Sequence, residues 1–118
     1  MVYSRDKVEQ IVIGTLLNEY GDDGFFEGSR VVLRKELFNE RRNAFIFEVI
    51  VRMTNDGLKQ TTPYDVFVYC NENGIRYGNM TNFCVYMCDV SVNYAFNGFK
   101  KYVKQLVDYY IREVKNGK

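Results

Sequence analysis

The cysteines are the side chains of this chain best suited to holding a metal ion. Cys84 and Cys88 stand four residues apart, about one turn of a helix, and Cys70 is the third cysteine. A structural zinc site needs four ligands, usually cysteine and histidine, and the chain contains no histidine. We therefore predict no metal site, and we interpret the three cysteines as buried apolar thiols.

Nucleotide hydrolysis requires a different pattern of residues. The phosphate-binding loop has the form Gly-x4-Gly-Lys-Ser/Thr, because backbone amides and the lysine surround the phosphates. The only Gly-Lys pair of this chain is Gly117-Lys118, and the other elements of the motif do not accompany it. The sequence therefore predicts no nucleotide-binding residue and no other cofactor.

Three carboxylates are conceivable general acids or bases. Asp22, Asp23 and Glu40 would serve in that way if a neighbouring group shifted their pKa values. The sequence places no such partner beside them, so solvated loop and helix-end charges are the better interpretation. We predict no catalytic residue and expect that the chain is not an enzyme.

A group of lysines near the end of the chain offers a possible nucleic-acid contact. Lys100, Lys101 and Lys104 fall close together on a predicted helix and would suit phosphate groups. Basic residues also commonly line an exposed helix face, and the chain as a whole carries a formal charge of only +1. Direct nucleic-acid binding is therefore expected to be weak or absent, and a small helical nucleic-acid-binding module, such as a mobile element would carry, stays open as the alternative function.

Length and composition indicate one globular domain, spanning residues 1–118. The chain is 47% hydrophobic and 16% aromatic, and the aromatic residues are nine Phe and ten Tyr without Trp. Tyrosine is favoured at protein interfaces, so the surplus suggests contact with a partner as well as a core. The polar first residues do not resemble a signal peptide, and no apolar run approaches a membrane span. With an odd number of cysteines, the expected location is the reducing cytoplasm, without a membrane partner.

Apolar residues recur at helical spacing along most of the chain, which predicts an all-α fold. We expect a compact, orthogonal bundle of about six helices with a long C-terminal helix. The first helix spans residues 5–20 behind an N-cap at Ser4, and it contains Gly14. A glycine inside a helix costs about 1 kcal/mol relative to alanine, so Gly14 indicates that another backbone packs close to it.

The middle of the chain carries clear start and stop signals for helices. Thr62 and Pro63 form a strong helix start, with threonine at the cap and proline at the first position. The expected elements are a short turn over 34–38, a helix over 41–55 ended by Asp56-Gly57, a helix from Thr62 to Asn73-Gly74, and a helix capped by Asn79 or Thr81 and running to about Val90.

The last helix, expected over residues 93–115, is the best candidate for a functional surface. Its apolar residues form a seam spaced four and three residues apart, as in a coiled coil, with flanking residues that widen it. A wide apolar face suits a second subunit as well as the domain's own core. The seam residues are Val92, Phe96, Phe99, Val103, Leu106 and Tyr110, flanked by Tyr102 and Tyr109 on one side and by Val107, Ile111 and Val114 on the other. The interface candidates are Phe99, Tyr102, Leu106, Tyr109 and Tyr110, of which Phe99 and Leu106 are expected to be core.

An ordered set of short motifs runs along the chain. Residues 9–17 read EQIVIGTLL, Phe38 is followed eight residues later by Ile46-Phe47, and Asn97 and Tyr102-Val103 fall in the last helix. This order resembles the N-terminal domain of DnaB-type replicative DNA helicases, whose opening pattern is roughly E-x-A-V-L-G-x-L-L. The resemblance covers residues from about 6 to 112. Further elements of it are Asp56-Gly57, Asn73-Gly74 and Tyr86-Met87.

The chain departs from the family pattern in three places. Asn43-Ala44 replaces a common His-Arg pair, Thr61 or Thr62 replaces an acid, and residues 28–33 look like an insertion. The resemblance implies a non-catalytic module that self-associates and docks a primase or a helicase loader during DNA replication. The ATPase motor of such helicases lies in a separate C-terminal domain, whose phosphate-binding motif this sequence lacks.

Overall fold

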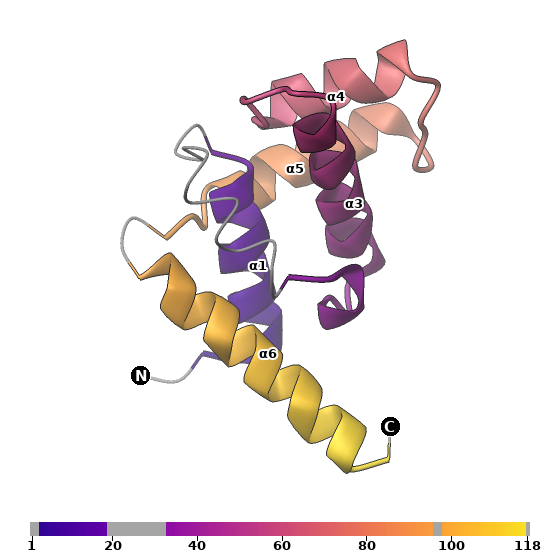
Figure 1. Ribbon diagram of the computed structural model, residues 1–118. Coiled ribbons are helices and arrows are strands. Elements are labelled where there is room, and N and C mark those ends of the chain that lie inside the picture. The colour runs from indigo at the N-terminus through magenta and orange to yellow at the C-terminus, as the bar shows by residue number, and fades with distance from the viewer. Residues whose placement is uncertain (1–2, 19–32, 96–97, 118) are drawn as a thin grey trace.

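The computed structural model describes residues 3–18, 33–95 and 98–117, and every regular element in these ranges is helical. The all-α prediction is confirmed. There are five α-helices and one three-residue 3-10 turn in the described residues, where the sequence predicts about six helices. In chain order these are α1 (Arg5–Leu16), the 3-10 turn η1 (Lys35–Leu37), α3 (Arg41–Asn55), α4 (Pro63–Glu72), α5 (Met80–Ser91) and α6 (Phe99–Lys115) (Figure 1).

Side-chain caps fix where four of these helices begin, and the caps of α1, α4 and α5 are residues that the sequence predicts. The Ser4 hydroxyl accepts a hydrogen bond from the Lys7 backbone N–H at 3.2 Å, as the sequence predicts. Thr62 caps α4 through a reciprocal pair of bonds with Asp65, and proline occupies the first turn. Of the two residues proposed to cap α5, Asn79 does so. Each cap satisfies an N–H group that the helix itself leaves without a partner.

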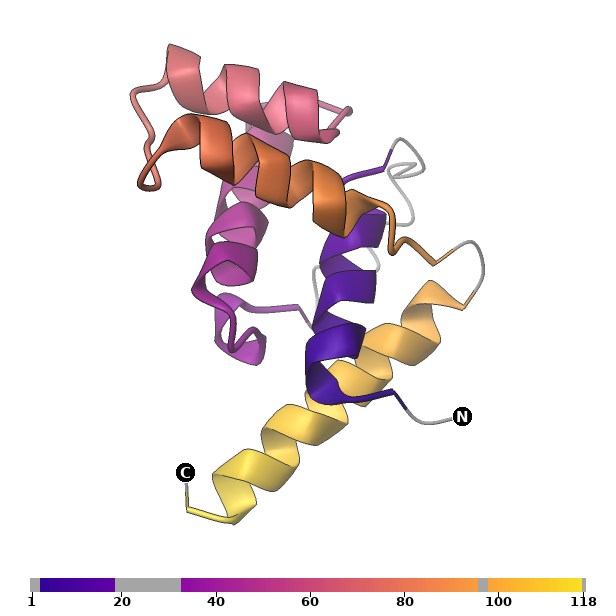
Figure 2. The same cartoon turned by 180° about the vertical axis from the view of Figure 1, so that it is seen from behind.

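Helix α1 lies at the centre of the molecule. It packs against α3, α5 and α6, while α4 packs against α3 and α5 on the sides that face away from α1 (Figures 1 and 2). As a result, α4 and the C-terminal end of α6 lie at opposite ends of the molecule (Figure 2). The buried apolar residues form one cluster that takes side chains from every helix; the fully buried ones include Val8, Val12, Ile46, Ile50, Val66, Met87 and Leu106.

Gly14 lies where α1 crosses the end of α5. A Cβ atom at this position would stand 2.5 Å from the carbonyl oxygen of Val90 and 3.3 Å from the backbone nitrogen of Tyr94. Real Cβ atoms do not approach a backbone atom as closely as the first of these distances. The close backbone packing predicted from the sequence is confirmed, and glycine is what allows α1 and α5 to meet.

Two predicted helix boundaries are wrong. Helix α6 begins at Phe99 rather than near residue 93, because Gly98 adopts a left-handed conformation with φ of 76° and cannot continue a helix. Val92 instead closes α5, and its side chain is 75% exposed, so it does not belong to the seam. Helix α1 ends at Leu16, four residues before the predicted end, which lies outside the described residues together with Phe96.

Candidate interaction surface

Helix α6 lies along α1 with one face buried and the other open. Phe99, Val103 and Leu106 point into the core, and the first and last of these are 3% and 0% exposed. Phe99 and Leu106 therefore contribute to the fold of their own subunit and offer no surface to a partner. The remaining candidates, Tyr102, Tyr109 and Tyr110, are half-buried.

The N-terminal segment covers part of the tyrosine edge. The Tyr109 hydroxyl donates a hydrogen bond of 2.6 Å to the backbone carbonyl oxygen of Tyr3. The ring of Tyr3 also lies 6.2 Å from the ring of Tyr102, measured between centroids. Tyr102 and Tyr109 thus hold the chain's own N-terminal segment against α6, which leaves less of this edge for another protein than the sequence suggests.

The other edge of the helix carries the more open apolar surface. Val107 and Tyr110 are half-buried, whereas Ile111 and Val114 are 44% and 54% exposed. These four residues recur at spacings of three, one and three, which places them on one stripe of the helix. The last turns of α6 project beyond the end of α1, so the stripe is displayed at one end of the molecule (Figures 1 and 2). We call these four residues the distal stripe.

A buried arginine anchors this end of the helix. Arg5 is 8% exposed, forms an ion pair with Glu113 of α6, and donates a hydrogen bond of 2.7 Å to the carbonyl oxygen of Leu37. Its guanidinium also lies 3.5 Å from the carboxylate of Glu9 in α1. The distal stripe is therefore carried by a helix whose position is set from both α1 and the η1 segment.

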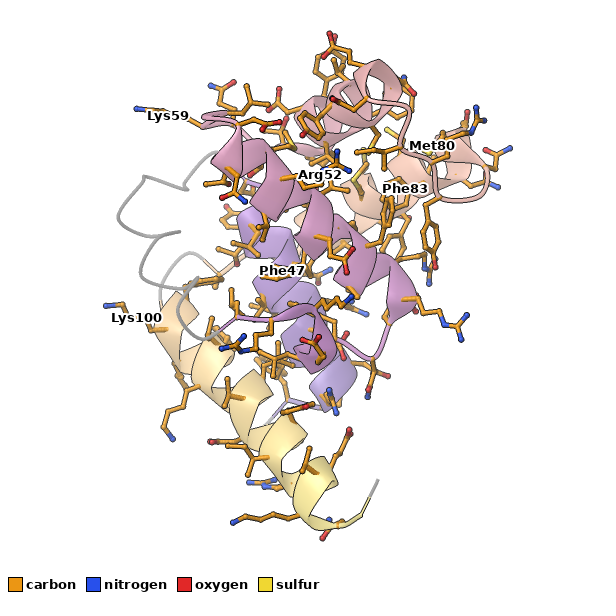
Figure 3. All side chains as sticks on the ribbon, turned by 45° about the vertical axis from the view of Figure 1, so that its right-hand side comes forward. Phe47, Arg52, Lys59, Met80, Phe83 and Lys100 are labelled. Carbon is orange, nitrogen blue, oxygen red and sulfur yellow. The ribbon has the colours of Figure 1, made fainter. Side chains whose placement is uncertain are left out.

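The lysines proposed to contact nucleic acid are exposed and lie on the first turns of α6. Figure 3 shows Lys100 extending away from the body of the molecule. The Lys101 ammonium lies 6.0 Å from the centre of the Tyr102 ring, and Lys104 pairs with Asp108 at 3.4 Å. The structure thus brings the three together on one exposed part of α6, with one of their charges offset by an aspartate.

A polar pocket of about 320 Å³ lies between α1, the start of α3 and α5. Its deepest member is Glu9, which is 1% exposed and accepts hydrogen bonds from the backbone of Asn39 at 2.7 Å and from the Asn43 amide at 3.3 Å. Burial raises the pKa of Glu9, and these hydrogen bonds oppose that rise. Helical periodicity alone does not single out Glu9, although an acid amid the apolar residues of the first helix is a signal of a buried role.

The neighbouring groups in this pocket also have structural partners. The Tyr86 hydroxyl donates a 2.5 Å hydrogen bond to the side-chain oxygen of Asn43, and burial raises the pKa of Tyr86 to about 12. Glu40 caps α3 and accepts two bonds from the Arg42 guanidinium, which lowers the pKa of Glu40. The hydrogen bonds of this pocket therefore connect α3 with α1 through Asn43 and Glu9, and α3 with α5 through Asn43 and Tyr86. Glu40 caps α3 in its ionised form. Asp22 and Asp23 lie outside the described residues.

A larger groove, of about 480 Å³, separates the end of α3 from α4. Leu58 and Tyr64 flank it and are 43% and 73% exposed. On its wall the Tyr69 hydroxyl donates a 2.6 Å hydrogen bond to Asp56, whose carboxylate raises the pKa of Tyr69. The lining of this groove thus mixes apolar side chains with a tyrosine that is held by a carboxylate.

The cysteines differ in exposure. Cys70 is fully buried in α4 and burial raises its pKa, as expected of an apolar core thiol. Cys84 is half-buried and Cys88 is exposed, so the prediction of buried thiols is wrong for Cys88 and right only in part for Cys84. Both lie on α5, and the sequence alone does not show which side of this helix faces solvent. All three thiols are free.

None of the helices in the described ranges combines the length and the apolar character needed to cross a membrane. A scan against models of protein families finds no match for this chain, and a search of curated proteins finds none either. The similarity to the N-terminal domains of DnaB-type helicases therefore stays a prediction made from the sequence motifs.

Proposed function

We propose that this chain is a non-catalytic protein–protein interaction module that associates with itself through the distal stripe of α6. The observation that carries the proposal is the exposure of Ile111 and Val114 on a helix end that projects from the molecule and is anchored by Arg5. Large apolar side chains that gather on one rigid, projecting surface are typical of a contact with another protein.

The exposed area sets the expected strength of this association. Full burial of an exposed Val or Ile contributes about 1.5–3 kcal/mol, so a half-exposed one contributes about 1 kcal/mol. A symmetric contact would bury Ile111 and Val114 from each of two copies, which contributes about 4 kcal/mol before the cost of lost translational and rotational freedom is subtracted. Val107 and Tyr110 would add to this, and lost rotational freedom would oppose it. The association is therefore weak and depends on concentration.

The order of motifs supports a role in DNA replication. Gly14 supports the resemblance to the DnaB-type N-terminal domains, because it makes a close helix contact inside the family's opening pattern. In that role the module would present its globular helices to a primase or a helicase loader while α6 joins subunits. The free thiols fit the reducing cytoplasm.

Sedimentation velocity over a range from about 10 µM to 1 mM tests the proposal, because a weak dimer is populated mainly toward the upper end of that range. The wild type should shift from monomer toward dimer, and the double variant Ile111→Asp/Val114→Asp should stay monomeric. Val85→Asp is the matched control, since Val85 and Val114 are both 54% exposed but lie on different helices. A wild type that stays monomeric at the highest concentration contradicts the proposal.

The tyrosine edge requires its own variant. If Tyr102 and Tyr109 serve a partner rather than the N-terminal segment, Tyr102→Ala/Tyr109→Ala should abolish the dimer without changing the thermal unfolding midpoint. Since Tyr109 bonds to Tyr3 within the same chain, we expect this variant to lose stability and to retain the dimer.

A second candidate function is nucleic-acid binding, favoured by the common exposure of Lys100, Lys101 and Lys104 on α6. Binding of this kind depends steeply on salt, because lysines release counterions from phosphates. Titration of single-stranded and duplex DNA at low salt, with the triple lysine-to-alanine variant as control, distinguishes it from protein docking. Absence of binding at low salt removes this candidate.

A further inference from the structure

Helix α5 presents two thiols on its outer side. Cys84 and Cys88 are four residues apart, and α5 is continuous from Met80 to Ser91, so they occupy successive turns of one helix face. Cys84 is half-buried, Cys88 is exposed, and neither forms a disulfide. The pKa of Cys84 is raised by burial first, and also by Cys88 and a hydrogen bond with it, which indicates that the two sulfur atoms are neighbours.

The spacing suits a bridged pair of thiols better than a disulfide. Residues at this spacing have Cβ atoms about 5–6 Å apart, whereas a disulfide needs Cβ atoms about 3.5–4.5 Å apart. Zinc lies about 2.3 Å from a thiolate sulfur, so two sulfurs on opposite sides of an ion of similar bond length stand about 4.6 Å apart. Two thiols on successive turns can therefore hold an ion without any distortion of the helix.

The number of ligands selects the ion. Zinc in structural sites takes four ligands, and iron–sulfur clusters take four thiolates. No group of three or more histidine, cysteine or acidic side chains in the described residues is placed to hold a metal, and Cys70 is buried in the core. Soft d10 monovalent ions are stable between two thiolates, and thiolate ligands select Cu(I) over hard cations.

We propose that Cys84 and Cys88 form a two-thiolate site for a soft monovalent ion, Cu(I). Each thiol gives up its proton and forms one Cu–S bond, so binding of one Cu(I) releases two protons and leaves a site with a charge of −1. No electron is transferred. The exposure of Cys88 leaves one side of the site open, so the ion exchanges with solvent ligands rather than being enclosed. The site lies on α5 and does not depend on self-association through α6.

Anaerobic competition with a chromogenic Cu(I) chelator tests the site. The wild-type protein and Cys70→Ala, in which only the core thiol is changed, should each bind one Cu(I) per chain with the same affinity. Cys84→Ser and Cys88→Ser should each bind at least about a hundredfold more weakly, because loss of either thiol removes the second, intramolecular attachment. Far-UV circular dichroism checks that α5 remains helical in each variant.

A register variant separates this geometry from a general affinity of thiols for copper. Cys88→Ser/Asp89→Cys keeps two cysteines on α5 but moves the second to the next residue, around the helix from Cys84. It should bind as weakly as the single variants. Binding of the register variant with wild-type affinity, retention of that affinity by either single variant, or a stoichiometry of one Cu(I) per two chains would each overturn the proposal.

Discussion

Gly14 and Val90 are in direct backbone contact: a Cβ on residue 14 would stand 2.5 Å from the Val90 carbonyl oxygen. This contact holds the last turn of α1 against the last turn of α5. Because the neighbouring atom belongs to the backbone, it cannot move aside as a flexible side chain would. The glycine is therefore required by the packing of two helices rather than by its own conformation.

Gly14→Ala should destabilise the protein. In an open helix this substitution gains about 1 kcal/mol, but overpacking of a close contact costs about 1–3 kcal/mol, so we expect a net loss. Urea denaturation measures the change in the free energy of unfolding. The exposed Thr81→Ala in α5 is a control and should change it by less than about 0.5 kcal/mol. A gain in stability for Gly14→Ala would show that α1 and α5 can separate at little cost.

Glu9 gives a prediction about pH. Its pKa is raised above the ordinary value of 4.5, so the folded protein binds this proton more tightly than the unfolded chain. The contribution of Glu9 to stability is thus full below its unfolded pKa and is lost as pH rises through the raised folded pKa. Because Gln does not titrate, the unfolding free energy of the wild type minus that of Glu9→Gln should therefore fall as pH rises from about 4.

Asp6→Asn is the control for the pH series. Asp6 borders the same pocket and lies on the same helix, but its side chain is exposed. The Asp6→Asn series therefore identifies the part of the pH dependence that does not come from Glu9. If the wild type instead gains stability relative to Glu9→Gln as pH rises, the hydrogen bonds from Asn39 and Asn43 to the Glu9 carboxylate outweigh the effect of burial.

Tyr109→Phe should loosen the N-terminal segment. The substitution removes the hydroxyl that donates to the Tyr3 carbonyl and costs about 1 kcal/mol, the usual net value of one hydrogen bond. Thermal unfolding measures the loss, and limited proteolysis should cut the N-terminal segment faster. Tyr64→Phe, at a residue whose side chain is 73% exposed, should change neither. Equal behaviour of the two variants would mean that the segment is held by other contacts.

Thr62→Ala should weaken the start of α4. The threonine hydroxyl accepts from the Asp65 N–H at 3.3 Å, and the Asp65 carboxylate accepts from the Thr62 N–H at 3.1 Å. Loss of such a cap costs about 1 kcal/mol. Urea denaturation should show this loss. Thr61→Ala is the control, because it leaves the cap intact and removes only the hydrogen bond from the Thr61 hydroxyl to the Leu16 carbonyl oxygen. No loss for Thr62→Ala would mean that Pro63 alone sets the helix start.

Local signals made most of the helices predictable. Ser4 and Thr62 bond to groups three residues away, so their roles can be recognised in a short stretch of sequence. The helix over residues 41–55 was predicted with its observed bounds, because its apolar periodicity is strong and Asp56-Gly57 follows it. The start of α6 is not predictable in this way, because the seam spacing continues back through Gly98, whose left-handed conformation ends the helix.

The candidate surface was harder to predict because it depends on contacts between distant residues. The tyrosine edge is partly covered through the bond from Tyr109 to Tyr3, which are separated by 106 positions. The burial of Glu9 and the exposure of Cys88 likewise depend on which helices pack against α1 and α5. Helical periodicity shows which residues share a face of a helix, but it does not show which other helix covers that face. The sequence named Tyr110 and the apolar flank of α6, but only the structure shows that the flank is the open side.

Arg5 has a consequence for how the molecule opens. Its guanidinium is bound to Glu113 of α6, to the Leu37 carbonyl and beside Glu9 of α1. Detachment of α6 would leave a buried positive charge without one of its anions, which is costly, so α6 does not fray independently of α1. The amide protons in the turn of α6 that carries Glu113 should therefore exchange with solvent mainly in openings that also separate α6 from α1.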